Sequence, residues 1–315
     1  MYFPYLRGRQ NELICLRELL KEGLLSPKIV PIIEPVRYSS TLFSTLESFI
    51  KNERPIILIE NPKVGSFKEE EEAFFKKLKD SNQLEITAEK NENILQNKYI
   101  QKAYLTDKTI LDKCINGEIN VDDVVLINEA SDYYNIYNDN KGLLNAKLTV
   151  VPFRDELADV ITGNLVCFRD GFKKAKRNVD YADSPDEFFN RTHILYKNYY
   201  KGFSDFSIVG KNYEESGFAP VAIAIHIVYF DKDDLNVHHF LSKTNDDISD
   251  PARKFAEAVE DMLQWGNYKM IKETYGLKKI IEYYNDGRFP GLGVVKKYSI
   301  MHHLELIGDF LEDEK

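Results

Sequence analysis

Charged and amide side chains recur at the ends of the short apolar runs of this 315-residue sequence. A carboxylate at such a place can work as an acid or base or bind a divalent cation, and an arginine can hold a phosphate through two hydrogen bonds. Glu34 closes the apolar part of one run, and Glu60 closes that of the run beginning at Pro55. The other residues of this kind are Asn61, Asn128, Glu129, Arg154, Asp155, Arg169, Asp170 and Asp205.

Glu34 and Glu60 are the strongest individual candidates, because each ends a strongly apolar run and precedes a loop that contains proline. Any single charge at a strand end also has a plain structural interpretation, since such groups commonly pair with each other. The recurrence at several run ends is therefore better evidence for a site than any one member.

The elements that must position these residues alternate over the first two thirds of the chain. Several of the apolar runs are continuous, which is typical of parallel strands buried on both faces. Eight such units in about 200 residues predict an α/β fold of the (β/α)8 TIM-barrel type, whose strand ends face one common mouth. An open doubly wound sheet has the same alternation, but the sequence contains no GxGxxG after the first run and no P-loop. The predicted strands are Tyr2–Leu6, Lys28–Val36, 55–62, Tyr99–Leu105, Val124–Asn128, Leu148–Phe153, Leu165–Arg169 and Gly202–Val209.

The pattern changes after the eighth run. Two apolar stretches, 221–230 and 237–241, flank the polar turn Asp231–Asp234 and predict a β-hairpin. Helical patterns follow at 251–263, 277–284 and 298–311. We therefore expect a barrel-like core over residues 1–210, with the hairpin and helices of residues 211–315 packed on it as one structural unit.

Histidines and one basic cluster are the remaining candidates. His238 and His239 are adjacent on a strand and point to opposite faces, so they make a poor chelate, and His226 can face either one across the hairpin. A single histidine that reaches a pocket for proton transfer is a better interpretation than a histidine-rich metal centre. The cluster Lys173–Arg177 can attract a phosphate or an acidic partner, although a solvated helix face would look the same.

Composition excludes several classes of protein. The formal net charge of −9 argues against a duplex nucleic-acid binder, which needs a basic footprint. The three cysteines show no CxxC spacing, so neither a disulfide scaffold nor a cysteine-built zinc site is expected. The N-terminal residues lack the pattern of a signal peptide, and the most apolar stretch is about half a membrane span. These features predict a cytoplasmic protein.

Short motifs in a fixed order resemble the phage-type beta-protein family over nearly the whole chain. The first are Tyr2-Phe-Pro-Tyr-Leu-Arg-Gly, with Glu12 and the Leu16/Leu19 helix behind it, and Pro31-Ile-Ile-Glu-Pro. The later ones are Ser204-Asp-Phe, Trp265-Gly-Asn and His302-His-Leu-Glu. Two positions depart from the family pattern, which has Asp at the place of Asn267 and Asn at the place of Met301.

The resemblance implies a bacterial or phage-borne protein from defence-rich or mobile gene neighbourhoods, often beside a nuclease-like effector protein. It implies no defined activity. The positions that match the family motifs are Arg7, Glu34, Asp205, Trp265, His302 and His303.

Together these observations predict a component of a prokaryotic anti-phage or mobile-element system that works beside an effector. We expect its barrel mouth to bind an anionic ligand, for example a phosphorylated one, or an anionic partner through Arg7, Arg154 and Arg169, with Glu34 and Glu60 fixing the orientation. Asp170 and His302 are further candidates for ligand binding. The alternative is a metal-assisted hydrolase of a phosphoester, in which Glu34, Glu60 and Asp205 hold a divalent cation or act as base.

Overall fold

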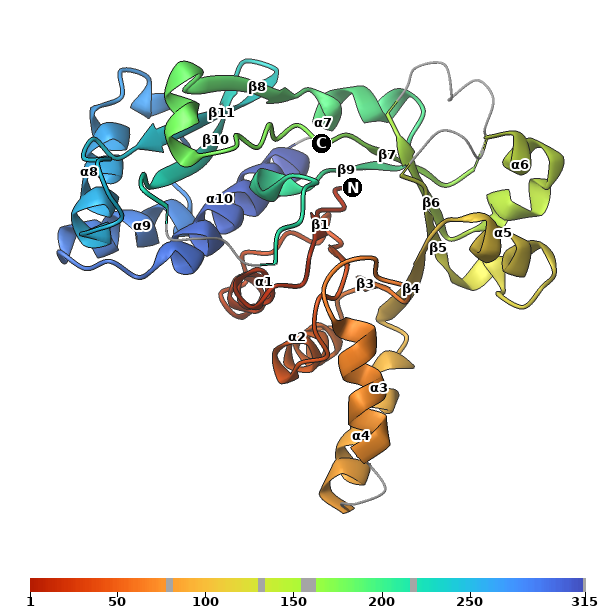
Figure 1. The fold of residues 1–315 in the computed structure, drawn as a ribbon. Coiled ribbons are helices and arrows are strands. Elements are labelled where there is room, and N and C mark those ends of the chain that lie inside the picture. Colours follow the sequence, from red (N-terminus) through yellow and green to blue (C-terminus); the bar gives the residue numbers. More distant parts are fainter. Residues whose placement is uncertain (78–81, 130–133, 154–162, 216–219, 314–315) are drawn as a thin grey trace. The chain divides into compact units, whose positions relative to one another are not determined.

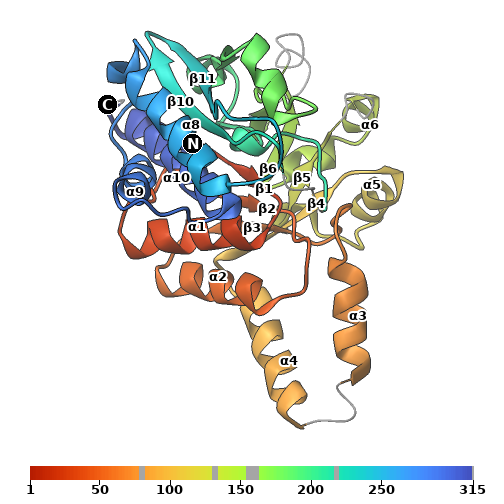
Figure 2. The same ribbon diagram turned by 60° about the vertical axis from the view of Figure 1, so that its left-hand side comes forward.

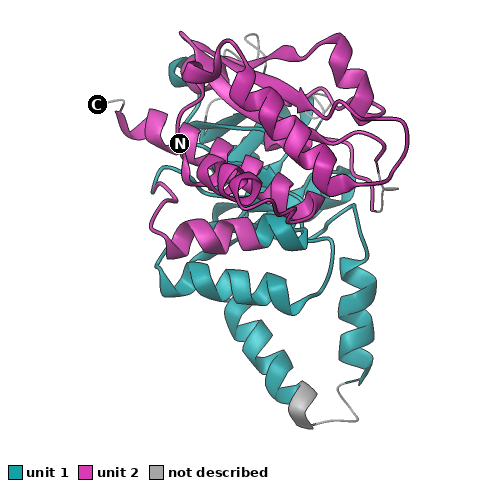
Figure 3. Cartoon of the chain, turned by 90° about the vertical axis from the view of Figure 1, so that its left-hand side faces the viewer, with its two compact units in different colours: residues 1–13, 27–169, 195–205 teal, residues 14–26, 170–194, 206–315 magenta. Residues whose placement is uncertain are grey.

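The fold comes from a computed structural model that describes residues 1–315 except 78–81, 130–133, 154–162, 216–219 and 314–315. The described chain divides into two compact units, which Figure 3 shows in different colours. Unit 1 contains residues 1–13, 27–169 and 195–205, and unit 2 contains residues 14–26, 170–194 and 206–315. The division therefore differs from the expected border at residue 210, because two earlier segments belong with the C-terminal part.

Unit 1 is built on a sheet of eight parallel strands, counted in the described residues. Each strand pairs with the strand of this sheet that follows it in the chain, and backbone hydrogen bonds from Phe3 to Phe203 and from Tyr5 to Asp205 bring the last strand beside the first. The sheet is thus a nearly closed barrel surrounded by helices, as predicted (Figure 1). Its strands are β1 (Tyr5–Leu6), β2 (Ile32–Ile33), β3 (Ile56–Ile59), β4 (Ile100–Leu105), β5 (Val125–Ile127), β6 (Leu148–Pro152), β7 (Leu165–Phe168) and β9 (Gly202–Ser204).

The helices of unit 1 follow their strands, and several begin at residues that favour a helix start. Ser39 accepts a hydrogen bond from the N–H of Leu42, and Asp107 accepts one from the N–H of Ile110. Figure 2 shows α3 and α4 extending from the strands. The helices are α1 (Gln10–Lys21), whose later part belongs to unit 2, α2 (Ser40–Lys51), α3 (Phe67–Lys77), α4 (Asn82–Leu95), α5 (Lys108–Ile115) and α6 (Tyr134–Asp139).

Unit 2 contains an antiparallel sheet with the strand order β10-β11-β8. The predicted hairpin is present as β10 (Ala224–Asp231) and β11 (Asp234–Leu241), and its register pairs His226 with His239. The third strand, β8 (Asp186–Asn190), was not predicted, because its sequence Asp-Glu-Phe-Phe-Asn is not an apolar run. The short helix α7 (Thr192–Leu195) follows it. Short 3₁₀ segments include η5 (Asn178–Asp183) and η7 (Ser207–Val209).

Three helices complete unit 2: α8 (Pro251–Gln264), α9 (Tyr275–Asn285) and α10 (Leu292–Asp313). Helix α10 begins six residues before the expected start at Tyr298, because its first turn contains a glycine and two valines that hide the helical pattern. A Cβ atom on Gly276 would lie 2.3 Å from the carbonyl oxygen of Tyr298. The close approach of α9 to α10 therefore requires glycine at this position.

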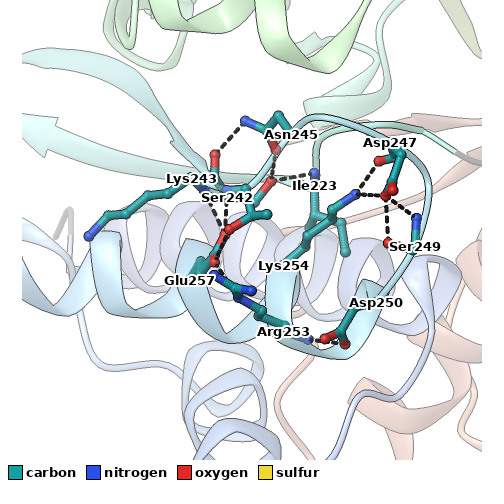
Figure 4. Close-up of polar contacts among 11 residues, drawn as sticks. Ile223, Ser242, Lys243, Asn245, Asp247, Ser249, Asp250, Arg253, Lys254 and Glu257 are labelled. Carbon is teal, nitrogen blue, oxygen red and sulfur yellow. Dashed lines mark hydrogen bonds and ion pairs between the residues drawn. The ribbon is translucent and has the colours of Figure 1, made fainter.

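The first turn of α8 is held by a polar network (Figure 4). Asp250 caps the helix by accepting from the N–H of Arg253. One turn later, Glu257 accepts hydrogen bonds from the N–H groups of Lys243 and Thr244 and from the Thr244 hydroxyl. These contacts attach the loop after β11 to the helix.

Candidate functional site

Tyr5 identifies the inner face of the barrel. Its ring centre lies 6.2 Å from that of Phe168, although β9 separates the two strands that carry these residues. Side chains of strands that are not neighbours approach one another on the concave side of a closed sheet, so both rings point inward. Residues two positions apart on a strand share a face, and Arg7 therefore also points inward.

Glu34 lies on this inner face and accepts hydrogen bonds from three donors. Its Oε2 accepts from the Tyr5 hydroxyl at 2.8 Å and from the Arg7 guanidinium, and its Oε1 accepts from the N–H of Lys63 at 2.8 Å. Arg7 and Glu34 form an ion pair and are only 5% and 1% exposed. The predicted rim arginine and carboxylate do come together, as a buried pair in which each neutralises the other.

Burial is also the main influence on the Tyr5 hydroxyl. It raises the pKa of Tyr5 well above its usual value, the charge of Glu34 raises that pKa further, and the charge of Arg7 opposes the shift. Tyr5 therefore stays protonated and remains a donor to Glu34 at neutral pH.

Glu60 points to the outer face of the barrel. Its N–H donates to the carbonyl of Ala103 at 2.9 Å, so the strand geometry continues to this residue. Ile57 is the register partner of Ile32, which lies two residues before Glu34, so Ile57 faces inward. Glu60 is three positions further along and faces outward, because the side-chain period of a strand is two. The pKa of Glu60 is raised by burial, against the opposing charges of nearby lysines.

Asp205 also points outward. Ser204 is the register partner of the inward residue Phe168, and Asp205 is the next residue. Its carboxylate accepts from the Tyr2 hydroxyl at 2.6 Å, and the Tyr2 ring stacks on Phe203 at 4.9 Å. Of the three carboxylates expected to share a catalytic site, Glu34 alone therefore lies on the inner face, since side chains alternate between the faces of the sheet.

The other predicted ligand residues do not form one group. Arg154 lies outside the described residues. Arg169 is exposed, with its guanidinium carbon 5.8 Å from the ring centre of Phe153. Asp170 accepts from the backbone N–H groups of Phe172 and Lys211, at 3.2 and 2.8 Å, which is the role of a loop-stabilising residue.

The motif residues of the C-terminal half are packing residues of unit 2. The Nε2 atom of His302 lies 2.7 Å from the carbonyl oxygen of Val228, and its Nδ1 lies 2.8 Å from the hydroxyl of Thr274. Burial lowers the pKa of His302 to about 4. The ring of Trp265 lies 4.5 Å from that of His238, and His303 lies beside Ser207. His302 and His303 are fully buried, so neither is placed to meet a ligand from solvent.

Unit 2 contains a cavity of about 790 Å³, a volume typical of small-molecule sites. Part of its lining is Ala224 and His226, on one face of β10, with Ala222 just before the strand, and the two alanines leave space that larger side chains would fill. One wall is the face of α10 that carries Leu292, Val295, Lys296 and Ser299, which are spaced as one helical stripe. Residues between 172 and 181 also line it.

Four basic side chains and one acidic side chain line this cavity. The basic ones are Lys174, Lys176, Arg177 and Lys296, and the acidic one is Glu214. Lys174 is 3.1 Å from Glu214, and Arg177 is 2.6 Å from Asp180. The predicted basic cluster thus contributes three side chains to a concave site, and it is not a helical face, because helical structure begins only at Asn178.

His226 is the titratable group that β10 contributes to the lining of the cavity. Its Nδ1 lies 2.7 Å from the Nδ1 of His239, and the ring of Tyr181 lies 4.8 Å from its own. The pKa of His226 is lowered well below its usual value by burial first, and then by the charges of His239 and Lys296. The pKa of His239 is lowered to about 4, chiefly by burial. Both imidazoles are therefore neutral at pH 7.

Sequence reasoning missed this cavity, because its walls come from segments more than a hundred residues apart. Two partial signals were present, namely the basic cluster and a histidine that faces a neighbouring strand.

In the described residues, no three His, Cys, Asp or Glu side chains are grouped so as to hold a metal ion. Among the described helices, none has both the length and the apolarity to span a membrane. Comparisons with models of protein families, with curated proteins and with solved structures found no match for this chain.

Proposed function

We propose that this protein binds a small phosphorylated ligand in the cavity of unit 2. The observation that carries the proposal is the excess of basic side chains around a cavity of about 790 Å³. A phosphate needs cationic donors such as Lys176 and Lys296, and it gains most from them where water is partly excluded. The rings of Phe172 and Tyr181 in the same lining would cover an aromatic or sugar group attached to the phosphate.

This proposal keeps the expected ligand class and changes the expected place. At the barrel mouth, Arg7 is paired with Glu34, so its charge is already neutralised inside the protein. Around the cavity of unit 2, Glu214 and Asp180 pair with Lys174 and Arg177, so the four basic side chains of the lining exceed these carboxylates by two. The role beside an effector protein and in a defence system rests on the family resemblance and stays a prediction.

The test is calorimetric titration with inorganic phosphate, phenyl phosphate and AMP, with adenosine as the uncharged control. We expect binding of the phosphorylated compounds that weakens as salt is raised, and no binding of adenosine. Lys176→Ala should weaken the binding of phenyl phosphate about 10-fold, the effect of losing one charge-assisted hydrogen bond.

Lys173→Ala is the matched control, because Lys173 belongs to the same basic cluster but does not line the cavity. It should change the dissociation constant less than about twofold. Equal effects of the two substitutions would mean that the basic cluster attracts anions without a specific site, and the proposal would then be wrong.

A further inference from the structure

His226 is the end of a row of three polar side chains that leads inward from the cavity. His226 lies on β10, His239 on β11 and Glu187 on β8, so the three strands of one sheet carry one member each. The Nδ1 atoms of the two histidines are 2.7 Å apart. The Nε2 of His239 and the Oε2 of Glu187 are 3.8 Å apart, and both atoms are buried without a hydrogen bond.

This order determines which ring nitrogens carry protons. A contact between two Nδ1 atoms is a hydrogen bond only when one ring donates and the other accepts. The carboxylate of Glu187 favours a proton on the Nε2 that faces it, so the neutral His239 accepts at Nδ1. His226 must then donate from its own Nδ1. The other ring nitrogen of His226, Nε2, does not contact His239. It therefore carries a lone pair and can accept a proton.

We propose that the cavity of unit 2 hydrolyses phosphate esters, with His226 as the general base and with His239 and Glu187 as positioning residues. The inference rests on the proposed binding of a phosphorylated ligand. The oxygen of a water molecule forms the new bond to phosphorus, and its proton passes to Nε2 of His226. The bond between phosphorus and the leaving oxygen breaks with its electron pair, and the proton held by the histidine pair returns to that oxygen. The products are an alcohol and a phosphate.

The surrounding charges suit this chemistry. Low pKa values keep both imidazoles unprotonated at neutral pH. The positive charge that develops during proton transfer is stabilised by Glu187 at the far end of the row. Lysines on the rim of the cavity offset the negative charge that builds up on the phosphoryl oxygens. The groups that influence the pair are Lys296 on α10, Tyr181 on η5, Asp186 and Glu187 on β8, and His238 on β11.

The experiment first identifies which ester binds, by the titration described above, and then follows that ester by phosphorus NMR from pH 3 to 9, with and without EDTA. We expect wild-type protein to hydrolyse it. His226→Gln should bind it within about threefold of wild type and lose at least about 100-fold in kcat, the usual contribution of a general base. Lys173→Ala should leave both binding and turnover unchanged.

Glu187→Gln tests the positioning role separately. Removing the carboxylate should leave KM unchanged and lower kcat. It should also shift the acid limb of the plot of kcat against pH by about 1 unit to lower pH, because the negative charge of Glu187 no longer favours the protonated histidine pair. A purely structural role would not move this limb. Thermal unfolding of each variant shows whether the fold is retained.

The outcomes separate the two proposals. If no phosphorylated compound binds, the proposed function fails and this inference fails with it. If an ester binds but wild-type protein does not hydrolyse it, binding stands and the catalytic inference is overturned. Turnover that survives in His226→Gln, or that EDTA abolishes, also overturns it.

Discussion

Arg7 and Glu34 show how a buried ion pair constrains the inside of the barrel. Removing one member of such a pair leaves the other charge buried without compensation, which costs roughly 3–5 kcal/mol. We therefore expect Arg7→Met to lower the free energy of unfolding by about that amount, as measured by urea denaturation of the full chain. The Arg7→Met/Glu34→Gln double variant should recover a large part of the loss, because both charges are then absent. Equal stability of the single and double variants would contradict this account.

For single residues, the sequence showed which ones lie at strand ends more reliably than which of them contact each other. The sequence correctly indicated that Arg7 and Glu34 lie at neighbouring strand ends, because adjacent parallel strands end at the same edge. It misplaced Glu60 and Asp205, because the face on which a strand-end residue lies depends on a register that composition does not reveal. The sequence also left open whether His226 faces His238 or His239, because it does not reveal the register of the hairpin. The pairing of β10 with β11 places His226 opposite His239.

The start of α8 depends on one carboxylate in the network of Figure 4. Partial burial alone would raise the pKa of Glu257, but hydrogen bonds from Thr244, from the N–H of Lys243 and from Arg253 lower it to about 2. Because the folded pKa lies below the usual value of 4.5, the stabilisation is fully present above pH 4.5 and is lost as the pH falls towards 2.

We therefore expect Glu257→Gln to lower the midpoint of thermal unfolding by about 2–6 °C at pH 7. The difference from wild type should shrink as the pH falls from about 4.5 to 2, which melting curves over this interval will show. A difference that stays constant across the interval would show that the ionised carboxylate is not what holds the loop to the helix.

Elements were predictable where the pattern was strong. Continuous apolar runs identified the parallel strands, since every residue of such a strand is buried, as along Ile56–Ile59. Strand β8 was missed, because only two of its five residues, Phe188 and Phe189, are apolar. The cavity was missed for a different reason, namely that its shape depends on how β10, α10 and residues 172–181 pack, and no local pattern encodes that.

The division of the whole molecule into two units does not follow the chain. Residues 170–194 belong to unit 2, and their strand β8 pairs with β11. A chain truncated after residue 210 would keep β8 and lose its partner strand. We expect such a truncation to be aggregation-prone and to lack the thermal transition of unit 2. A soluble, cooperatively folded fragment 1–210, seen by circular dichroism and calorimetry, would contradict this.

The position of residues 14–26 in unit 2 also has a consequence for biosynthesis. Glu18 in this segment lies 2.6 Å from Lys297, so it pairs with a residue that is synthesised 279 residues later. At typical ribosome speeds of about 5–20 residues per second, the interval between them is roughly 15–60 s. During that time Cys15, Leu16 and Leu19, which are fully buried in the finished protein, have no completed unit to bury them. The nascent chain is therefore a natural client for chaperones at the ribosome exit, and its yield in a cell should depend on them more than its final stability would suggest.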